Sequence, residues 1–275
     1  MAAAVNVLKI WLLLAGFCAL LGGVGWVLGG YRLLSIFVFC GLLAGAATYW
    51  YADRMILGLV GARPLAQAEA PALTSAVERL AARARVPLPR LHLIPDGYPR
   101  ALSAGRGRGQ TIVLSTGLLG ALPPAELEGV LAHELAHAAR RDVLLQTIAV
   151  VFAATLLELS RVGGWFQRAL LFVFGPVASA VVHGLLSPRR EFAADRQAAE
   201  LCDSPHGLAD ALARLEQAGE LVSFVGNPAT EPLHIVNPFE ERSLAGLFLT
   251  HPPVHERIRR LRELDPEWPE SLRAA

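Results

Sequence analysis

The chain contains little lysine, little cysteine and almost no net charge. Each of these shortages argues against a particular class of protein. Lys9 is its single lysine, and the formal net charge of +1 over 275 residues offers no surplus to attract a polyanion such as nucleic acid. Three scattered cysteines, Cys18, Cys40 and Cys202, cannot build a disulfide framework or a thiolate zinc site. The sequence therefore argues against a disulfide-rich domain and a nucleic-acid partner.

Charged residues are also missing from two long stretches near the N-terminus. None occurs from Ile10 to Tyr31 or from Leu33 to Ala52, and a helix needs roughly 20 residues to cross a bilayer. The mean hydropathy of +0.42 is high for a soluble protein. Gly29 to Arg32 predict a tight turn, and aromatic residues gather at the far end of the second stretch, as at a membrane interface. We predict a transmembrane hairpin over residues 1–55 rather than a cleaved signal peptide, which has a shorter apolar segment.

Further along, two histidines and a glutamate form the pattern H-E-x-x-H. His133 and His137 are four residues apart, so on a helix their imidazoles share one face and can bind one metal ion. Two imidazoles and one further ligand leave a tetrahedral zinc with an open position for water, whose proton the carboxylate of Glu134 can take. The pattern predicts hydrolytic zinc chemistry rather than the polar face of an ordinary helix.

The residues around this pattern favour a helix. Pro123-Pro124 stand where a helix can begin, acidic residues occupy its first turn, and leucines recur at helical spacing. Gly129, one turn before His133, is expected to leave room beside the metal.

Before this helix, the sequence alternates between helical and strand-like segments. We predict a linker over residues 53–70, followed by an amphipathic helix that begins at Pro71 and ends near Arg85. His92 alternates with leucines and is expected to face solvent. We predict a small antiparallel β-sheet whose edge can pair with an extended peptide substrate. Its strands are Leu91–Ile94, Ala101–Ala104 and Thr111–Leu114.

Two more uncharged runs follow the metal helix. Val143–Leu157 spans only about 22 Å as a helix, whereas Ala169–Ser187 is long enough to cross a membrane. The two runs fit either a second transmembrane hairpin or partial packing on the domain. Flanking arginines are more numerous on the side of the zinc motif, which predicts a cytoplasmic site. The counted residues are Arg54, Arg63, Arg140, Arg141, Arg189 and Arg190 on that side, against Arg32, Arg161 and Arg168.

The third metal ligand is expected just after the second run. Glu191 and Asp195 are four residues apart on a helix that a proline begins, so they share a face. We predict that Glu191 binds the metal and that Asp195 accepts the outer N–H of a ligand histidine. Both acids have arginine neighbours as alternative partners. Glu158 is the rival ligand, but it lies toward the far end of a membrane-like run.

Several motifs together resemble those of the HtpX-type integral-membrane zinc metallopeptidases, which are kin to the CAAX prenyl endopeptidases. They are the paired N-terminal runs, V-L-A-H-E-L-A-H, R-D, a second hydrophobic pair, S-P-R-R-E-F-A-A-D and T-H-P-P-V-H-E-R-I. The resemblance covers nearly the whole chain. One departure is that the family's N-A-F-A-T-G is replaced by Arg100 to Gly105, so Arg100 is expected to replace or alter a contact to substrate.

The resemblance implies a mainly α-helical fold with a gluzincin-like zinc peptidase domain and one Zn²⁺ per chain. The implied ligands are His133, His137 and Glu191, with Glu134 as the general base and Asp195 as support for a ligand. By its spacing alone, His251 is either a capping or surface residue or a donor to an oxyanion, and the resemblance favours a contact to the transition state.

We divide the chain into a transmembrane hairpin, a first part of the peptidase domain, a second hydrophobic hairpin and a second part of the domain. These are residues 1–55, 56–142, 143–187 and 188–275. The predicted function is cleavage of misfolded or damaged membrane proteins by a multi-pass enzyme of the inner membrane, facing the cytoplasm. One alternative is a membrane-anchored zinc sensor or partner-binding protein without turnover. A structural zinc site is another, and it requires a fourth protein ligand. The natural substrate and the oligomeric state are left open.

Overall fold

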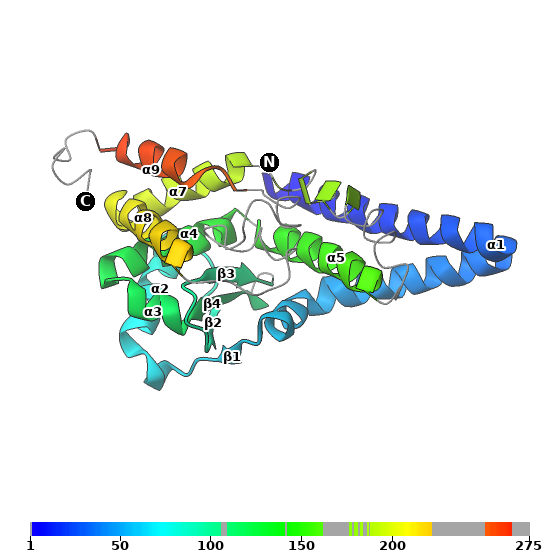
Figure 1. Cartoon of the computed structure of the whole chain (residues 1–275), viewed down its shortest axis with the longest axis horizontal. Helices are drawn as coiled ribbons and strands as arrows, with labels where there is room; N and C mark the ends of the chain where they lie inside the picture. Colours follow the sequence, from blue (N-terminus) through cyan, green and yellow to red (C-terminus); the bar gives the residue numbers. More distant parts are fainter. Residues whose placement is uncertain are drawn as a thin grey trace.

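A long helical hairpin projects from a domain in which helices surround a four-stranded sheet (Figure 1). The structure is a computed structural model that describes residues 2–105, 109–140, 142–161, 188–221 and 251–265, with a few residues between 176 and 186. The elements are α1 (Ala2–Val60), β1 (Arg63–Pro64), the 3₁₀ turn η1 (Gln67–Glu69), α2 (Pro71–Ala84), β2 (Arg90–Ile94), β3 (Ala101–Ala104), β4 (Thr111–Ser115), α3 (Thr116–Ala121), α4 (Pro124–Ala139), α5 (Val143–Arg161), α7 (Pro188–Cys202), α8 (His206–Leu221) and α9 (Val254–Arg262).

The hairpin is α1, whose two arms reverse direction at Gly29 and Gly30. Both residues have non-helical backbone angles, and Gly30 has a φ of +65°, which glycine adopts without strain. The segments Val7–Val27 and Gly29–Tyr51 are long and apolar enough to cross a membrane. The predicted turn is confirmed. The predicted linker over residues 53–70 is wrong in part, because the second arm stays helical to residue 60 and β1 and η1 follow it.

The sheet is mixed, so the predicted antiparallel arrangement is wrong. Its strand order is β1-β2-β4-β3, in which β2 and β4 are parallel and the two outer pairs are antiparallel. All five residues of β4 are buried, and a strand without an exposed face is favoured at the centre of a sheet. β4 therefore lies between β2 and β3, although β2 and β3 follow one another in the chain. The three predicted strands are present, with ends that differ by at most one residue.

Helices cover both faces of the sheet, and two apolar cores meet on it. Ile112 and Leu114 of β4 belong to a core shared with α2, α4, α7, α8 and α9. Val113 faces the other way and belongs to a core with Ile56 of α1 and with α5. Because side chains alternate along a strand, each core takes every second residue of β4. The sheet thus connects the hairpin to the helices that carry the H-E-x-x-H pattern (Figure 1).

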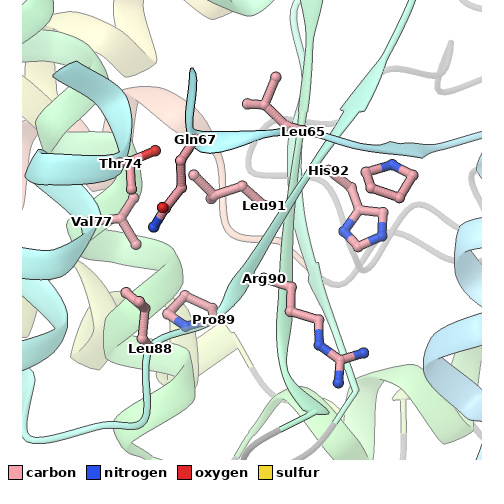
Figure 2. Close-up of a pocket in the computed structure, with 10 residues that line it drawn as sticks. Leu65, Gln67, Thr74, Val77, Leu88, Pro89, Arg90, Leu91 and His92 are labelled. Carbon is pink, nitrogen blue, oxygen red and sulfur yellow. The ribbon is translucent and has the colours of Figure 1, made fainter. Parts of the chain in front are cut away.

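His92 is buried, so the expectation that it faces solvent is wrong. Its side chain lies on the face of β2 opposite Leu91 (Figure 2), where the end of α1 covers the sheet. Burial lowers the pKa of the His92 imidazole, and Arg90 lowers that pKa further. His92 is therefore a neutral side chain of the interior. A pocket of about 380 Å³, lined mainly by apolar side chains, lies between β2, η1 and α2, on the side toward which Leu91 points (Figure 2).

Gly129 marks the point where α4 approaches the start of α8. A Cβ atom at Gly129 would lie 2.5 Å from the backbone N of Leu208, and one at Gly207 would lie 2.5 Å from the carbonyl O of Ala125. Neither backbone can move aside easily, because interiors are close-packed. The space beside Gly129 is therefore taken by α8, which corrects the expectation that it serves the metal.

α5 lies between the α1 hairpin and the sheet (Figure 1). Its Ile148 packs in one cluster with Ile10 of α1, whereas Val150 and Val151 pack against the sheet. Among the residues whose side chains the structure describes, its apolar stretch is Val143–Ala153. The run 169–187 lies mostly outside the described residues, as does the side chain of Glu158, so the second hydrophobic hairpin stays a prediction.

Candidate metal and catalytic site

α4 carries both histidines of the H-E-x-x-H pattern into the interior. The helix begins at Pro124, where a missing N–H is tolerated, and Glu126 lies near the positive end of its dipole. His133, Glu134 and His137 are 1%, 4% and 4% exposed. The Nε2 atoms of the two histidines are 3.2 Å apart, so the imidazoles share one face of a helix as predicted.

α7 brings the third predicted ligand to the two histidines. It begins at Pro188, and Glu191 lies in its first turn. Glu191 Oε1 is 3.4 Å from His137 Nε2, and Oε2 is 3.6 Å from His133 Nε2. One donor atom from each of the three residues lies within 4.8 Å of the others. Two helices that are separated by about fifty residues of chain thus assemble one cluster.

This donor set fits a metal ion such as zinc. The three separations of 3.2, 3.4 and 3.6 Å resemble the edge of a tetrahedron with ligand distances of 2.0–2.1 Å, which is about 3.3 Å. Burial lowers the pKa of His137, but the Glu191 and Asp142 carboxylates outweigh it and raise that pKa to about 9. The local field therefore favours a cation among these atoms. Two imidazole nitrogens and a carboxylate oxygen are ligands that zinc accepts.

The outer nitrogen of His133 contacts a buried ion pair between Asp195 and Arg257. Its Nδ1 atom is 2.9 Å from Asp195 Oδ1, and Asp195 accepts hydrogen bonds of 2.7 and 2.9 Å from Arg257 of α9. Burial raises the pKa of Asp195, but Arg257 outweighs it and lowers that pKa to about 2. A charged Asp195 keeps the imidazole proton on Nδ1, which leaves the lone pair of Nε2 facing the cluster.

His137 has a carboxylate behind it as well. Asp142 lies in the turn after α4, is 2% exposed, and has its Oδ2 atom 3.5 Å from His137 Nδ1. Arg140 and Arg190 place Nε atoms 3.4 and 3.3 Å from the same carboxylate oxygen. Each of the two histidines therefore has an acid at its outer nitrogen and an arginine that pairs with that acid.

Glu134 is held by a strand rather than by a helix. Ser103 of β3 donates a hydrogen bond of 2.5 Å from Oγ to Glu134 Oε2, and both side chains are buried. Ser103 is two residues from Ala101, which packs in the core that contains α4. The sheet thereby fixes the carboxylate that the sequence assigns as the base.

His251 lies inside the cluster rather than on the surface. Its side chain is 8% exposed, and its Nδ1 atom is 3.0 Å from Glu191 Oε2. Burial raises the pKa of Glu191, but His251 and His137 outweigh it and hold that pKa well below its usual value. Of the two readings that spacing allows, the surface residue is wrong.

Arg100 stands where the family pattern has asparagine, and it is built into the turn before β3. Its Nη2 atom is 2.8 Å from Asp96 Oδ2. Its backbone N donates to Ser115 Oγ at 2.9 Å, and Ser115 N donates to its carbonyl at 3.0 Å. The side chain is 9% exposed, and burial lowers its pKa. A contact between Arg100 and substrate stays a prediction.

Sequence reasoning missed Arg257, Asp142 and Ser103. A signal existed for Arg257, because it lies on the apolar stripe that Val254, Ile258 and Leu261 form on one face of α9. An arginine on a buried face requires a partner acid. Ser103 carried a weaker signal, a polar residue within a short apolar strand. Asp142 belongs to the R-D motif of the family resemblance, but nothing local marked it as a partner of His137.

Comparison with known proteins identifies the family. Residues 67–265 match the sequence profile of peptidase family M48. The chain belongs to this family. It is therefore a metallopeptidase, and the resemblance to HtpX-type proteases is confirmed.

Relatives in this family match the chain along most of its length. A protease HtpX homologue of Pelotomaculum thermopropionicum is 38% identical over 93% of this chain and 98% of the relative. One from Thermococcus kodakarensis is 38% identical over 94% of this chain and 96% of the relative. The fold is similar to that of Ste24p from S. mikatae, with a TM-score of 0.50 and 18% identity. That similarity covers 94% of this chain and 64% of Ste24p, so the chain spans less than two thirds of that protein.

The ion pair behind His133 supplies a test of this site. Asp195→Asn leaves Arg257 buried without its carboxylate, which costs about 3–5 kcal/mol, and loosens the imidazole, which weakens metal binding by about 10–100-fold. We expect a lower Tm and earlier metal loss in a chelator titration. Asp203→Asn is the control, because Asp203 also pairs with an arginine at 2.7 Å but is exposed. Equal effects of the two substitutions would contradict the role given to Asp195.

Proposed function

We propose that this chain is a membrane-anchored zinc endopeptidase that cleaves unfolded segments of damaged membrane proteins. One observation carries the proposal: His133 and His137 of α4 meet Glu191 of α7 with Glu134 beside them, all buried. The relatives named protease HtpX homologue support the peptide substrate and the quality-control role. The two apolar arms of α1 support the membrane anchor.

His133, His137 and Glu191 would hold the zinc. When bound, zinc supplies Lewis acidity toward the scissile carbonyl and the attacking water. Three candidate ligand side chains lie together among the described residues, and a zinc held by them would keep one position open to water and substrate. This count speaks against the alternative of a structural zinc site, which requires a fourth protein ligand.

Glu134 is the general base and acid of the proposed reaction. Its carboxylate takes one proton from water as the oxygen attacks the carbonyl carbon, and it returns that proton to the nitrogen as the C–N bond breaks. The hydrogen bond from Ser103 occupies Oε2, so Oε1 is the oxygen left for the water. His251 and Arg257 lie beside Glu191, and His251 is the side chain we assign as donor to the oxyanion.

β3 is the strand that we assign to substrate. It pairs with β4 on one side and ends the strand order on the other, so an extended peptide can continue the sheet along its outer edge. Ser103 of this strand contacts Glu134, so a peptide bound there lies within reach of the base. Arg100, at the start of β3, would meet one end of such a peptide.

The membrane arrangement is part of the proposal. We assign the α1 hairpin to the inner membrane and the zinc cluster to the cytoplasmic side, because the flanking arginines favour that side. Residues 56–142 and 188–275 would form the peptidase domain. The run 143–187 would form the second hairpin between its two parts.

Replacing the base tests the chemistry. Glu134→Gln keeps the size of the side chain but cannot take a proton, so kcat for an unfolded membrane substrate falls by about 10²–10⁴-fold. Zinc content stays near that of the wild type, because Glu134 is not a ligand. Glu128→Gln is the control, since Glu128 lies on the same helix and pairs with Arg79 at the surface. The assays are peptide cleavage and metal analysis of the full chain in detergent.

Undiminished cleavage by Glu134→Gln would overturn the mechanism. A zinc sensor without turnover predicts that this variant keeps the cellular phenotype, whereas His133→Ala, which loses the metal, does not.

Removing the serine tests how the base is positioned. Ser103→Ala frees Glu134 to move from its place in the cluster, so kcat falls by about tenfold while KM changes by less than about twofold. Ser103→Thr keeps the hydroxyl and restores most of the rate. Steady-state kinetics measure the separate changes in kcat and KM. An unchanged zinc content excludes a loss of metal as the cause. A fall in kcat/KM that comes from KM alone would show that Ser103 serves substrate binding instead.

A further inference from the structure

A strongly basic pocket lies on the outer side of α7, away from the zinc ligands. It has a volume of about 440 Å³ and is bounded by α7, the end of α4 and α9. Its eight lining residues include four arginines and one glutamate, and two of the arginines, Arg140 and Arg260, pair with the acids Asp142 and Glu256 just outside the lining. The arginines are Arg140, Arg189, Arg196 and Arg260. Arginine presents fixed N–H donors that match the oxygens of a phosphate group, so this lining suits an anion of that kind.

The pocket opens on the side of α7 opposite the catalytic cluster, and Arg140 connects the two through Asp142. Glu191 and Asp195 face the interior and are buried, whereas Arg189 and Arg196 of the same helix are exposed. Arg260 is held in place, because its guanidinium lies 3.8 Å from the ring centroid of Phe192 and its Nε donates to Glu256 at 2.7 Å. A side chain that is already oriented loses less entropy when it binds a ligand.

Aromatic residues of α1 mark the level of the membrane boundary. Trp11 lies near the start of the first apolar arm, and Tyr49 lies near the end of the second. Their rings are stacked with centroids 6.3 Å apart, and Trp50 packs against Tyr49. Tryptophan and tyrosine concentrate where hydrocarbon meets headgroups. This end of the hairpin is therefore expected at one headgroup layer, as is the turn end, which carries the exposed residues Trp26 and Tyr31.

The basic pocket lies next to this boundary, on the side of the domain. Ile10, the neighbour of Trp11, packs in one cluster with Leu145 of α5 and with Leu186. Arg140 precedes Leu145 by five residues, and Arg189 follows Leu186 by three. Both arginines thus lie within five residues of side chains that pack against the membrane hairpin.

We propose that this pocket binds the phosphodiester headgroup of an anionic phospholipid in the adjoining leaflet. Four arginines around one pocket, two of them exposed on α7, favour a lipid with net negative charge over a zwitterionic one. The first turn of α7 opens beside Arg189, and its dipole adds positive potential. The bound lipid would fix α4, α7 and α9 relative to the membrane. The proposal rests on the membrane hairpin and not on catalysis by Glu134.

Selective lipid retention tests the proposal. The full chain in detergent is mixed with equal amounts of phosphatidylglycerol and phosphatidylcholine, and the bound lipid is counted by native mass spectrometry. We expect the wild type to retain phosphatidylglycerol in preference. Arg189→Gln with Arg196→Gln lowers this retention by roughly 25-fold, because each arginine at an anionic surface contributes about fivefold. The control is Arg85→Gln with Arg90→Gln, which removes two exposed arginines from the other side of the domain.

Three results would overturn the proposal. One is equal retention of both lipids by the wild type, and another is an equal loss in the control. The third is displacement of phosphatidylglycerol by millimolar inorganic phosphate, which would make the pocket a site for free phosphate. Glu134→Gln retains the lipid as the wild type does, so failure of the lipid site and failure of the proposed peptidase mechanism give different results.

Discussion

The site depends on a group of opposite charges that is almost entirely removed from water. Glu191 and Asp195 are carboxylates of α7, and Arg257 of α9 reaches both, at 2.7 Å from Asp195 and 4.0 Å from Glu191. A single charge left unpaired in such an interior costs several kcal/mol, so these groups favour only arrangements that bring them together. Because α4 adds the histidines, three helices that are distant in sequence are locked by the same group. The same buried ion pairs therefore determine both the electrostatics of the cluster and the packing of these three helices.

β3 links this cluster to the membrane hairpin. Ser103 holds Glu134 on one face, while Leu102, the preceding residue, packs on the other face with the end of α1 and with α5. A change in the hairpin can thus reach the base through one short strand. The proposed substrate edge lies on this same strand, beside Glu134.

Local patterns predicted most of the cluster and little of the sheet. Spacing of four residues placed His133 with His137 and Glu191 with Asp195, because a helix alone decides which of its residues share a face. The order of the strands depends on burial of β4 from both sides, which no property of consecutive residues reveals. His92 was misjudged for the same reason, since α1 covers that face from a distance in sequence. The only sequence signal for the buried position of Arg257 was its place on the apolar stripe of α9.

The most direct measurement of the central claim is the coordination of zinc in the purified chain, by X-ray absorption and anomalous diffraction at the zinc edge. The account predicts one zinc per chain, bound by Nε2 of His133 and His137 at about 2.0–2.1 Å and by the Glu191 carboxylate at about 2.0–2.2 Å, with one position left for solvent. Glu191→Gln should lower the zinc content. A zinc bound without Glu191, or enclosed by four protein ligands, would contradict it.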